Sequence, residues 1–388
     1  YFPSPETYYV LGETFLRKID FSPKINYNSG EKEREREKMR SFDYSNLKNK
    51  TWDSEILGLV AQIHEYKGRQ ELYLKQKPEE LDKLIEIAKI QSTEASNEIE
   101  GIRTTNTRLK QLVADKTTPR NRDEEEIMGY RDVLNTIHEN YEYIPIRANY
   151  ILQLHRDLFQ YSEKGIGGHF KNTQNYISAT DTEGNEFVLF TPLAPYETPA
   201  AVDAICESYN RVIDTQEIDT LILIPVFIHD FLCIHPFNDG NGRMSRLLTT
   251  LLLYRSGYVI GKYISLESKI AKNKNLYYDA LEACQRDWYE NQEDPAPFIK
   301  YLLRTILAAY RDFEDRVDLV SEKLLAVEIV RRAVYGKIGK FTKSDIMELC
   351  PTIGKTSVES SIKQLVDRGV LVKHGSGRST YYTRSDAE

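Results

Sequence analysis

Cysteine and long apolar runs are scarce in this chain of 388 residues. The four cysteines, Cys206, Cys233, Cys284 and Cys350, lie in apolar surroundings without CxxC or another ligand-like spacing, which argues against disulfides and a zinc site. We therefore expect buried thiols and a cytoplasmic protein. The longest apolar run, LILIPVFI at 221–228, is far shorter than the roughly 20 residues that cross a bilayer, so no membrane segment is predicted.

The chain also has fewer basic than acidic residues. The 59 acidic residues outnumber the 52 basic ones and leave a formal net charge of −7. This balance argues against general binding of the whole molecule to nucleic acid or to a membrane surface. Residues 321–388 are the exception, with twelve Lys and Arg against eight Asp and Glu. A basic excess is therefore found at the C-terminal end.

Strand patterns are rare, and most of the chain has helical periodicity, so we predict a mainly α protein. Apolar residues recur every three or four positions in ILGLVAQIHEY, LDKLIEIAKI and later segments, as in amphipathic helices. The run EKEREREKMR near the N-terminus indicates a solvated arm or an exposed helix. The predicted regions are an N-terminal arm at 1–50, a helical region at 51–115, a helical core at 116–317 and a distinct C-terminal region at 318–388.

Two segments depart from the all-helical pattern. Within 170–192, YIS and FVLF flank the turn-rich TDTEGN, which predicts a short β-hairpin. Near the C-terminus, KLLAVEIVRRAV, TKSDIMELC and KTSVESSIKQLVDRG predict three helices, and VLVKHGSGRSTYYTR predicts two strands around a glycine turn. This order of elements is typical of a winged helix-turn-helix.

The side chains that carry chemistry concentrate in HPFNDGNGRMSR at 235–246. Gly240-Asn241-Gly242 allows the backbone of this stretch to adopt conformations that are closed to other residues. A helix is expected to begin at about Arg243, and the free amides of a helix start bind anions. Arg243 and Arg246 lie three residues apart on one face and add guanidinium groups to the same pocket. These features predict a polyphosphate site.

Two further residues of the stretch predict catalysis at that site. Asp239 lies at its edge, where a carboxylate would hold Mg²⁺ bridging phosphate oxygens. His235, four residues earlier, is placed to take a proton from an attacking hydroxyl. The stretch therefore has the parts required for attack on a metal-bound nucleotide.

The stretch resembles the signature of the Fic family, HPFx(D/E)GNGRxxR, at every specified position. Fic proteins are helical enzymes that mostly transfer AMP from ATP to a Ser, Thr or Tyr hydroxyl of a target protein. The resemblance implies these roles: His235 as general base, Asp239 for Mg²⁺, Gly240 to Gly242 as phosphate cradle, and Arg243 and Arg246 for the β- and γ-phosphates. A nucleotide held by its β- and γ-phosphates turns its α-phosphorus to the nucleophile, so we expect AMP to be transferred.

The likeness covers about residues 85–310. The hairpin predicted at 170–192 is similar to the family's flap, on which a target protein docks by strand addition. NLYYDALEACQ resembles the family helix whose paired tyrosines pack on adenine, which implies that role for Tyr277 and Tyr278. Gln285 stands where some relatives have an asparagine.

A second motif lies upstream, in STEASNEIEGIRTTN. Ser96 and Glu100 are four residues apart, on one face of a helix that Gly101 could end. The segment resembles the family's inhibitory motif, (S/T)xxxE(G/N). An unliganded Arg246 is satisfied by a carboxylate where the γ-phosphate should bind. The resemblance therefore implies autoinhibition by an N-terminal helix.

Three functions remain open from the sequence. The leading hypothesis is an autoinhibited protein adenylyltransferase with a winged-helix appendage. The same site could instead remove AMP from a modified protein, with Glu100 orienting a water. The third is a transcriptional regulator whose Fic core senses nucleotide and whose residues 321–388 bind DNA. The mildly basic face for that contact comprises Lys355, Lys363, Lys373, His374 and Arg378. The alternative for this region is a protein-interaction or homodimer-forming module.

Overall fold

The computed structural model describes residues 40–76, 78–163, 165–180, 186–321, 326–337, 339–351 and 353–385. Most of the arm predicted at 1–50 lies outside these residues. Its last part forms the short helix η2 (Tyr44–Asn49), whose N-cap Asp43 accepts a hydrogen bond from the Ser45 amide. The described part of the chain is mainly helical, which confirms the predicted fold class.

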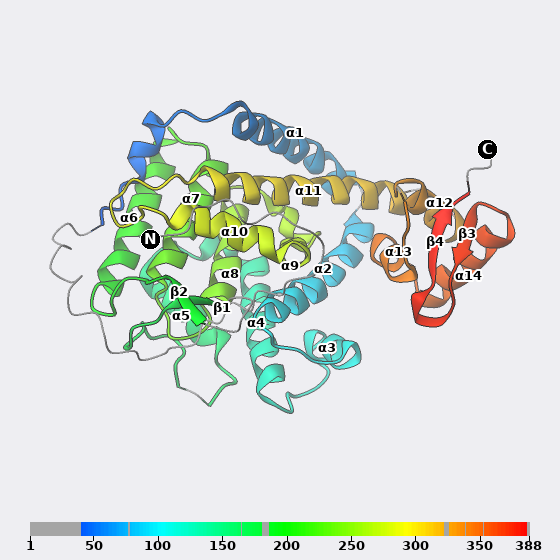
Figure 1. Cartoon of the computed structure of the whole chain (residues 1–388), viewed down its shortest axis with the longest axis horizontal. Helices are drawn as coiled ribbons and strands as arrows, with labels where there is room; N and C mark the ends of the chain where they lie inside the picture. The colour runs from blue at the N-terminus through cyan, green and yellow to red at the C-terminus, as the bar shows by residue number, and fades with distance from the viewer. Residues whose placement is uncertain are drawn as a thin grey trace, which may run out of the picture.

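Most of the described helices pack into one bundle (Figure 1). The first group comprises α1 (Ser54–Gln76), α2 (Pro78–Ile99), α3 (Asn106–Val113), α4 (Arg122–Asn140), η3 (Tyr141–Tyr143) and α5 (Ala148–Leu158). The second comprises α6 (Thr198–Thr215), α7 (Thr220–Ile234), α8 (Asn241–Arg255), η4 (Val259–Lys262), α9 (Leu266–Lys272), α10 (Lys274–Gln285) and α11 (Ala296–Ser321). Figure 1 shows α11 running beside α1 and on toward a C-terminal lobe.

Helices α7 and α8 form the centre of the bundle. Every residue of α7 from Leu221 to Ile234 is buried, which explains why its sequence is apolar on all sides. Asp219 caps its first turn by accepting a hydrogen bond from the Leu221 amide at 2.8 Å. The main core extends from Tyr44 to Val317, so the helical region predicted at 51–115 shares its core with the rest of the bundle.

The strand pair predicted within 170–192 is confirmed. Strands β1 (Ile177–Thr180) and β2 (Glu186–Phe190) pair antiparallel, with Ser178 opposite Val188 and an irregularity after Ile177. Residues 181–185 between them are not described. On β2, the side chains of Phe187 and Val188 are 46% and 52% exposed. The pair therefore offers apolar side chains to solvent at its outer surface.

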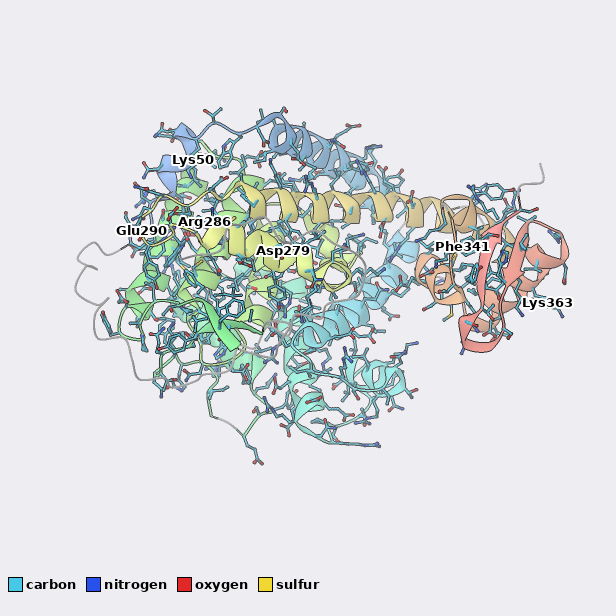
Figure 2. All side chains as sticks on the ribbon, viewed as in Figure 1. Lys50, Asp279, Arg286, Glu290, Phe341 and Lys363 are labelled. Atoms are coloured by element: carbon cyan, nitrogen blue, oxygen red, sulfur yellow. The ribbon has the colours of Figure 1, made fainter. Side chains whose placement is uncertain are left out.

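The C-terminal lobe has a core of its own, in which Phe341 is buried (Figure 2). It contains α12 (Ala326–Tyr335), α13 (Lys343–Leu349), α14 (Lys355–Asp367), β3 (Leu371–His374), η5 (Gly377–Ser379) and β4 (Tyr381–Arg384). Strands β3 and β4 are antiparallel, and Phe341 forms a bridge with Tyr382. Lys363 lies exposed on α14. This is the predicted order of elements, and the assignment to the winged-helix class stays a prediction.

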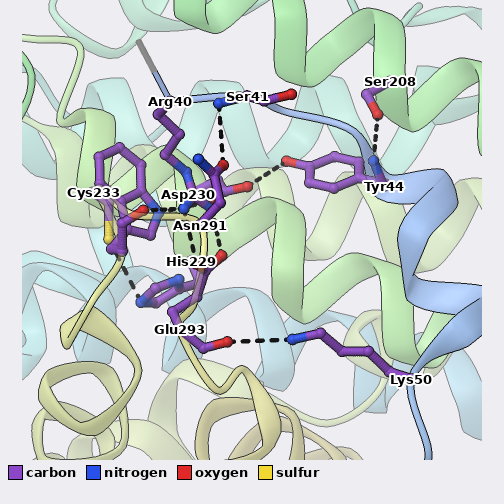
Figure 3. Close-up of polar contacts among 11 residues, drawn as sticks. Arg40, Ser41, Tyr44, Lys50, Ser208, His229, Asp230, Cys233, Asn291 and Glu293 are labelled. Carbon is purple, nitrogen blue, oxygen red and sulfur yellow. Dashed lines mark hydrogen bonds and ion pairs between the residues drawn. The ribbon is translucent and has the colours of Figure 1, made fainter. Parts of the chain in front are cut away.

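Arg40 joins the segment before η2 to the bundle (Figure 3). Its guanidinium donates to Asp230 on α7 at 2.8 Å and to Glu293 at 2.9 Å. Its charge also lies 4.3 Å from the ring centroid of Trp288. The Tyr44 hydroxyl donates to the second Asp230 oxygen at 3.0 Å. The two side chains of the Arg40–Asp230 pair are 5% and 2% exposed, so the segment is tied down by a buried ion pair.

Two further expectations concern cysteine and membranes. Cys206, Cys233, Cys284 and Cys350 are all buried and free, as expected. In the part of the chain that the structure describes, no helix has both the length and the apolar character needed to cross a bilayer.

Candidate active site

His235 follows the last residue of α7 and turns the chain into the loop that leads to α8. Its backbone is left-handed, with φ of +50°, which is costly for a residue with a Cβ. Phe237 anchors the loop in the core and stacks on His155 at a centroid distance of 3.7 Å. The Asn241 side chain closes the loop, accepting from the Phe237 amide at 2.9 Å and donating to its carbonyl at 2.7 Å.

The imidazole of His235 is held in a neutral form. Burial, with the cationic Lys171 nearby, lowers the pKa of His235 to about 3. Its Nδ1 lies 3.2 Å from the Leu232 carbonyl, so Nδ1 carries the proton and Nε2 is the basic nitrogen. A neutral imidazole with a fixed tautomer is the form that accepts a proton from a hydroxyl.

Helix α8 begins at Asn241, two residues before the expected start at Arg243. Gly240 is its N-cap, with φ of +86°, and a Cβ there would lie 2.8 Å from the Phe159 ring. Glycine therefore allows both the backbone conformation and the close packing. The earlier start moves Gly242 into the first turn, where backbone amides lack intrahelical partners.

Arg246 on α8 is paired with both residues of the predicted inhibitory motif. Its Nε donates to the Ser96 hydroxyl at 2.8 Å, and its Nη2 donates to the Ser96 carbonyl at 2.9 Å. The same Nη2 donates to Glu100 at 2.7 Å. Burial opposes the charge of Arg246, yet the pKa of this guanidinium is raised because Glu100 lies beside it. The ion pair expected from the sequence is therefore present.

The carboxylate of Glu100 also lies against the first turn of α8. A Cβ added at Gly242 would lie 2.3 Å from Glu100 Oε1, so the carboxylate packs directly on the glycine. Glu100 follows the end of α2, and Gly101 has the positive φ of +80° expected after a helix. An anion thus occupies the place where a helix N-terminus and an arginine meet.

A cavity opens beside these groups. Its polar walls include Glu100, His235, Gly242 and Arg246. Its other lining residues are Ile177, Leu189, Leu232, Tyr277, Tyr278, Leu281, Glu282 and Gln285. The lining therefore combines charged and apolar side chains, and the strand pair contributes to it. Such a lining suits a small organic ligand with a charged group.

The two tyrosines singled out from the sequence both line this cavity. They lie on α10, and their ring centroids are 5.3 Å apart. Tyr277 is only 4% exposed and also contacts Phe298 and Tyr301, so much of its ring belongs to the core. The structure therefore brings both tyrosines to the wall of the cavity, and Tyr277 is also part of the core.

Arg243 is placed differently from its expected role. Its side chain is 1% exposed and pairs with Glu126 on α4 at 2.8 Å and with Asp239 at 3.5 Å. It is not among the residues that line the cavity. Asn241 likewise uses its side-chain amide to brace the loop. Phosphate contacts by Arg243 and by the Asn241 side chain therefore stay predictions, and Arg246 is the arginine at the cavity.

Asp239 lies at the edge of the loop, with its side chain 37% exposed and Arg122 at 3.9 Å. Among the described residues, no group of three or more His, Cys, Asp or Glu could hold a metal ion. A cation here would therefore need phosphate oxygens as ligands. One carboxylate with phosphate oxygens and water is a common donor set for Mg²⁺, so Asp239 fits the predicted role.

Sequence reasoning missed the residues that support the loop from other elements. His155 on α5 lies 3.0 Å from the Asp239 carbonyl through Nε2, and its Nδ1 accepts from the Gly168 amide at 3.0 Å. Burial lowers the pKa of His155 to about 4, so it is neutral. Lys171 and Asn175 reach the loop from the segment before β1. None of these residues belongs to a recognisable spacing.

Comparison with known proteins agrees with this site. The Fic/DOC family model matches residues 145–253. Protein adenylyltransferase fic-1 of Caenorhabditis elegans is 26% identical over 186 residues, which cover 47% of this chain and 32% of that protein. Protein adenylyltransferase Fic of Drosophila erecta is 28% identical over 165 residues, 41% of this chain and 28% of that protein. The chain thus spans about a third of the length of these curated relatives.

A solved structure extends the likeness to most of the fold. The crystal structure of a Fic family protein from Desulfovibrio desulfuricans G20 has a TM-score of 0.56 and 19% identity. The match covers 87% of this chain and 98% of that one. At 19% identity, the match shows that the two proteins are similar in fold. Residues 145–253 thus match the Fic/DOC family model, and they lie within a fold similar to that of a solved Fic family protein.

Proposed function

We propose that this chain is a protein adenylyltransferase that moves AMP from ATP to a Ser, Thr or Tyr hydroxyl, and that Glu100 holds it inactive. The observation that carries the proposal is the position of the Glu100 carboxylate, on Gly242 and 2.7 Å from Arg246, beside the neutral His235. The curated relatives named above are protein adenylyltransferases, which supports the same reaction class.

The reaction divides among the residues of the cavity. His235 Nε2 takes the proton of the attacking hydroxyl, whose oxygen forms a bond to the α-phosphorus. The bond between that phosphorus and the α,β-bridging oxygen breaks, and pyrophosphate leaves with the electron pair. Arg246 and the first-turn amides of α8 bind the terminal phosphates, and Tyr277 and Tyr278 pack on the base. Mg²⁺, held by Asp239 and phosphate oxygens, would supply compensating positive charge.

The strand pair suits the docking of a target protein. Ile177 and Leu189 line the cavity, whereas Phe187 and Val188 are exposed on the same pair. An extended target segment that pairs with this edge would bring its hydroxyl close to His235.

Removal of AMP by the same site is the second candidate. The Glu100 carboxylate lines the same cavity as His235 and is 18% exposed, so it is within reach of a water molecule. A chain that carries AMP on a hydroxyl would then lose it faster in the presence of Glu100 than in a Glu100→Gly variant. DNA binding by 321–388, a homodimer and a cytoplasmic location remain predictions without a specific contact that favours them.

Labelled ATP tests the reaction. The full chain is incubated for a long period with Mg²⁺ and ATP labelled at either the α- or the γ-phosphorus, and label in the protein is counted. We expect α-label to enter and γ-label to stay in solution. His235→Ala should slow α-labelling by about 10²–10⁴-fold with ATP binding retained, as for loss of a general base. Entry of γ-label, or equal labelling of His235→Ala, would rule the mechanism out.

A further inference from the structure

The segment before β1 lies against the loop that carries His235. Four successive backbone carbonyls of that loop accept hydrogen bonds from it: Ile234 from Lys171 Nζ at 2.9 Å, His235 from Asn175 Nδ2 at 3.3 Å, Pro236 from the Lys171 amide at 2.8 Å, and Phe237 from Asn175 Nδ2 at 3.0 Å. Two residues outside the loop, Lys171 and Asn175, thus hold the backbone carbonyls on both sides of His235.

Both donors are buried within this contact. Lys171 is 3% and Asn175 is 2% exposed, and Lys171 Nζ donates to Asn175 Oδ1 at 3.0 Å. The oxygen partners of Nζ, an amide and a backbone carbonyl, are neutral. Burial lowers the pKa of Lys171 to about 7. Burying an ammonium group with neutral partners is unfavourable. A hydrophobic side chain would fill this space with a smaller free-energy penalty.

The contact acts on the most constrained backbone of the site. His235 adopts a left-handed conformation that is unfavourable for a residue with a Cβ, and such conformations persist only where surrounding contacts enforce them. The direction of its imidazole follows from this backbone. Hydrogen bonds to the carbonyls on both sides of His235 are the contacts that would enforce it.

We propose that Lys171 and Asn175 are positioning residues for the transfer reaction, which fix residues 234–237 so that His235 faces the attacking hydroxyl. This inference rests on the proposed function. Asn175 is two residues before Ile177, the first residue of β1 and part of the cavity wall. The pair therefore also ties the base of the strand pair, where a target would dock, to the catalytic loop. Neither residue touches the reacting atoms.

Two substitutions separate positioning from folding. Asn175→Asp keeps the size and an acceptor for Lys171 but removes the Nδ2 donor to two carbonyls. Lys171→Met removes the Nζ donor and keeps the aliphatic stem. Both are made in the 388-residue chain that carries Glu100→Gly, which we expect to turn over faster. Thr173→Val is the matched control, since Thr173 lies in the same segment and its hydroxyl donates to Asn238 at 3.3 Å in an exposed contact.

The readouts are the maximal rate of self-labelling from α-labelled ATP, the Kd for ATP and the thermal midpoint. For Asn175→Asp and Lys171→Met we expect the rate to fall by about 10²-fold, the effect of a small misplacement of a catalytic group, with Kd within threefold. Thr173→Val should keep its rate within twofold. Rates of both variants within threefold of the background, or a loss of ATP affinity that matches the loss of rate, would overturn the inference.

His235→Ala in the same background tells this inference from the function on which it rests. A labelling rate unchanged by His235→Ala means that the proposed reaction itself is wrong. Labelling that needs His235 and is unaffected by both positioning variants means that only the inference is wrong.

Discussion

In the proposed function, Arg246 is the residue for which ATP and Glu100 compete. A carboxylate oxygen and a phosphate oxygen make the same charged hydrogen bond to a guanidinium, worth about 1.5–3 kcal/mol. Glu100 makes this bond at 2.7 Å in a position where the Arg246 side chain is 3% exposed. Because the two anions cannot occupy one place, ATP would bind with its γ-phosphate displaced and its α-phosphorus turned away from the line of attack.

The residues that the sequence revealed are those that lie close together along it. His235 and Arg246 are eleven positions apart, so their spacing alone defines a recognisable loop and helix start. Glu100 lies far upstream and was assigned through the resemblance to the inhibitory motif. Lys171 and Glu126 reach the site only through packing of distant elements, and a lone Lys or Glu has no local signal for such a role.

At the scale of elements, α2 is held at several points besides Glu100. The Ser92 hydroxyl donates to the buried Glu267 at 2.7 Å, and Lys274 donates to the Ile99 carbonyl at 2.6 Å. Glu100 lies in the turn just beyond the end of the helix. Helix ends open at lower free energy than helix interiors. Displacement of the Glu100 turn therefore does not require that the whole of α2 leave the bundle.

Helices were predicted well because their apolar residues repeat every three or four positions over several turns. The start of α8 was predicted two residues late, because Asn241 uses its side chain to close the preceding loop while its backbone is already helical. The run EKEREREKMR is expected from the sequence to be solvated, and the side chain of its last residue, Arg40, is instead buried. A lone arginine gives no sign that its partner is a buried aspartate 190 positions away.

The anchoring of the N-terminal segment by Arg40 predicts a large loss of stability on substitution. Arg40→Ala leaves Asp230, whose side chain is 2% exposed, as an uncompensated buried charge. We expect the free energy of unfolding to fall by about 3–5 kcal/mol. Lys48→Ala is the matched control, because the Lys48–Glu217 pair lies in the same segment with side chains 47% and 51% exposed. That change should cost about 0–1 kcal/mol.

Denaturant unfolding of the two variants provides the comparison. Similar, small changes for Arg40→Ala and Lys48→Ala would show that the buried pair does not anchor the segment.

For the whole molecule, the buried histidines predict how stability depends on pH. Burial lowers the pKa of His138 and His235 to about 3 and that of His155 and His229 to about 4. Unfolded histidines titrate near 6.5, so below that pH the unfolded chain binds protons that the folded chain does not. Stability should therefore be full above about pH 6.5 and fall as the pH drops toward 4.

The slope of the free energy of unfolding against pH gives the number of buried histidines that contribute. Each histidine contributes up to about 1.4 kcal/mol per pH unit within this window. Denaturant unfolding at a series of pH values between 4.5 and 7.5 measures the total, and His229→Gln should reduce the slope by one group. A free energy of unfolding that is constant from about pH 6.5 to pH 5 would contradict the burial of neutral histidines.

The measurement that tests the central claim most directly is the initial rate of α-label entry into the parent, Glu100→Gly, and Glu100→Gly/Arg246→Ala, all with saturating ATP and Mg²⁺. Removal of the carboxylate frees Arg246 for the γ-phosphate, so Glu100→Gly should label itself faster by at least about tenfold, the effect of one charged hydrogen bond. The second substitution should cancel the gain, because the two residues act through one contact. Equal rates for the parent and Glu100→Gly would contradict inhibition by Glu100.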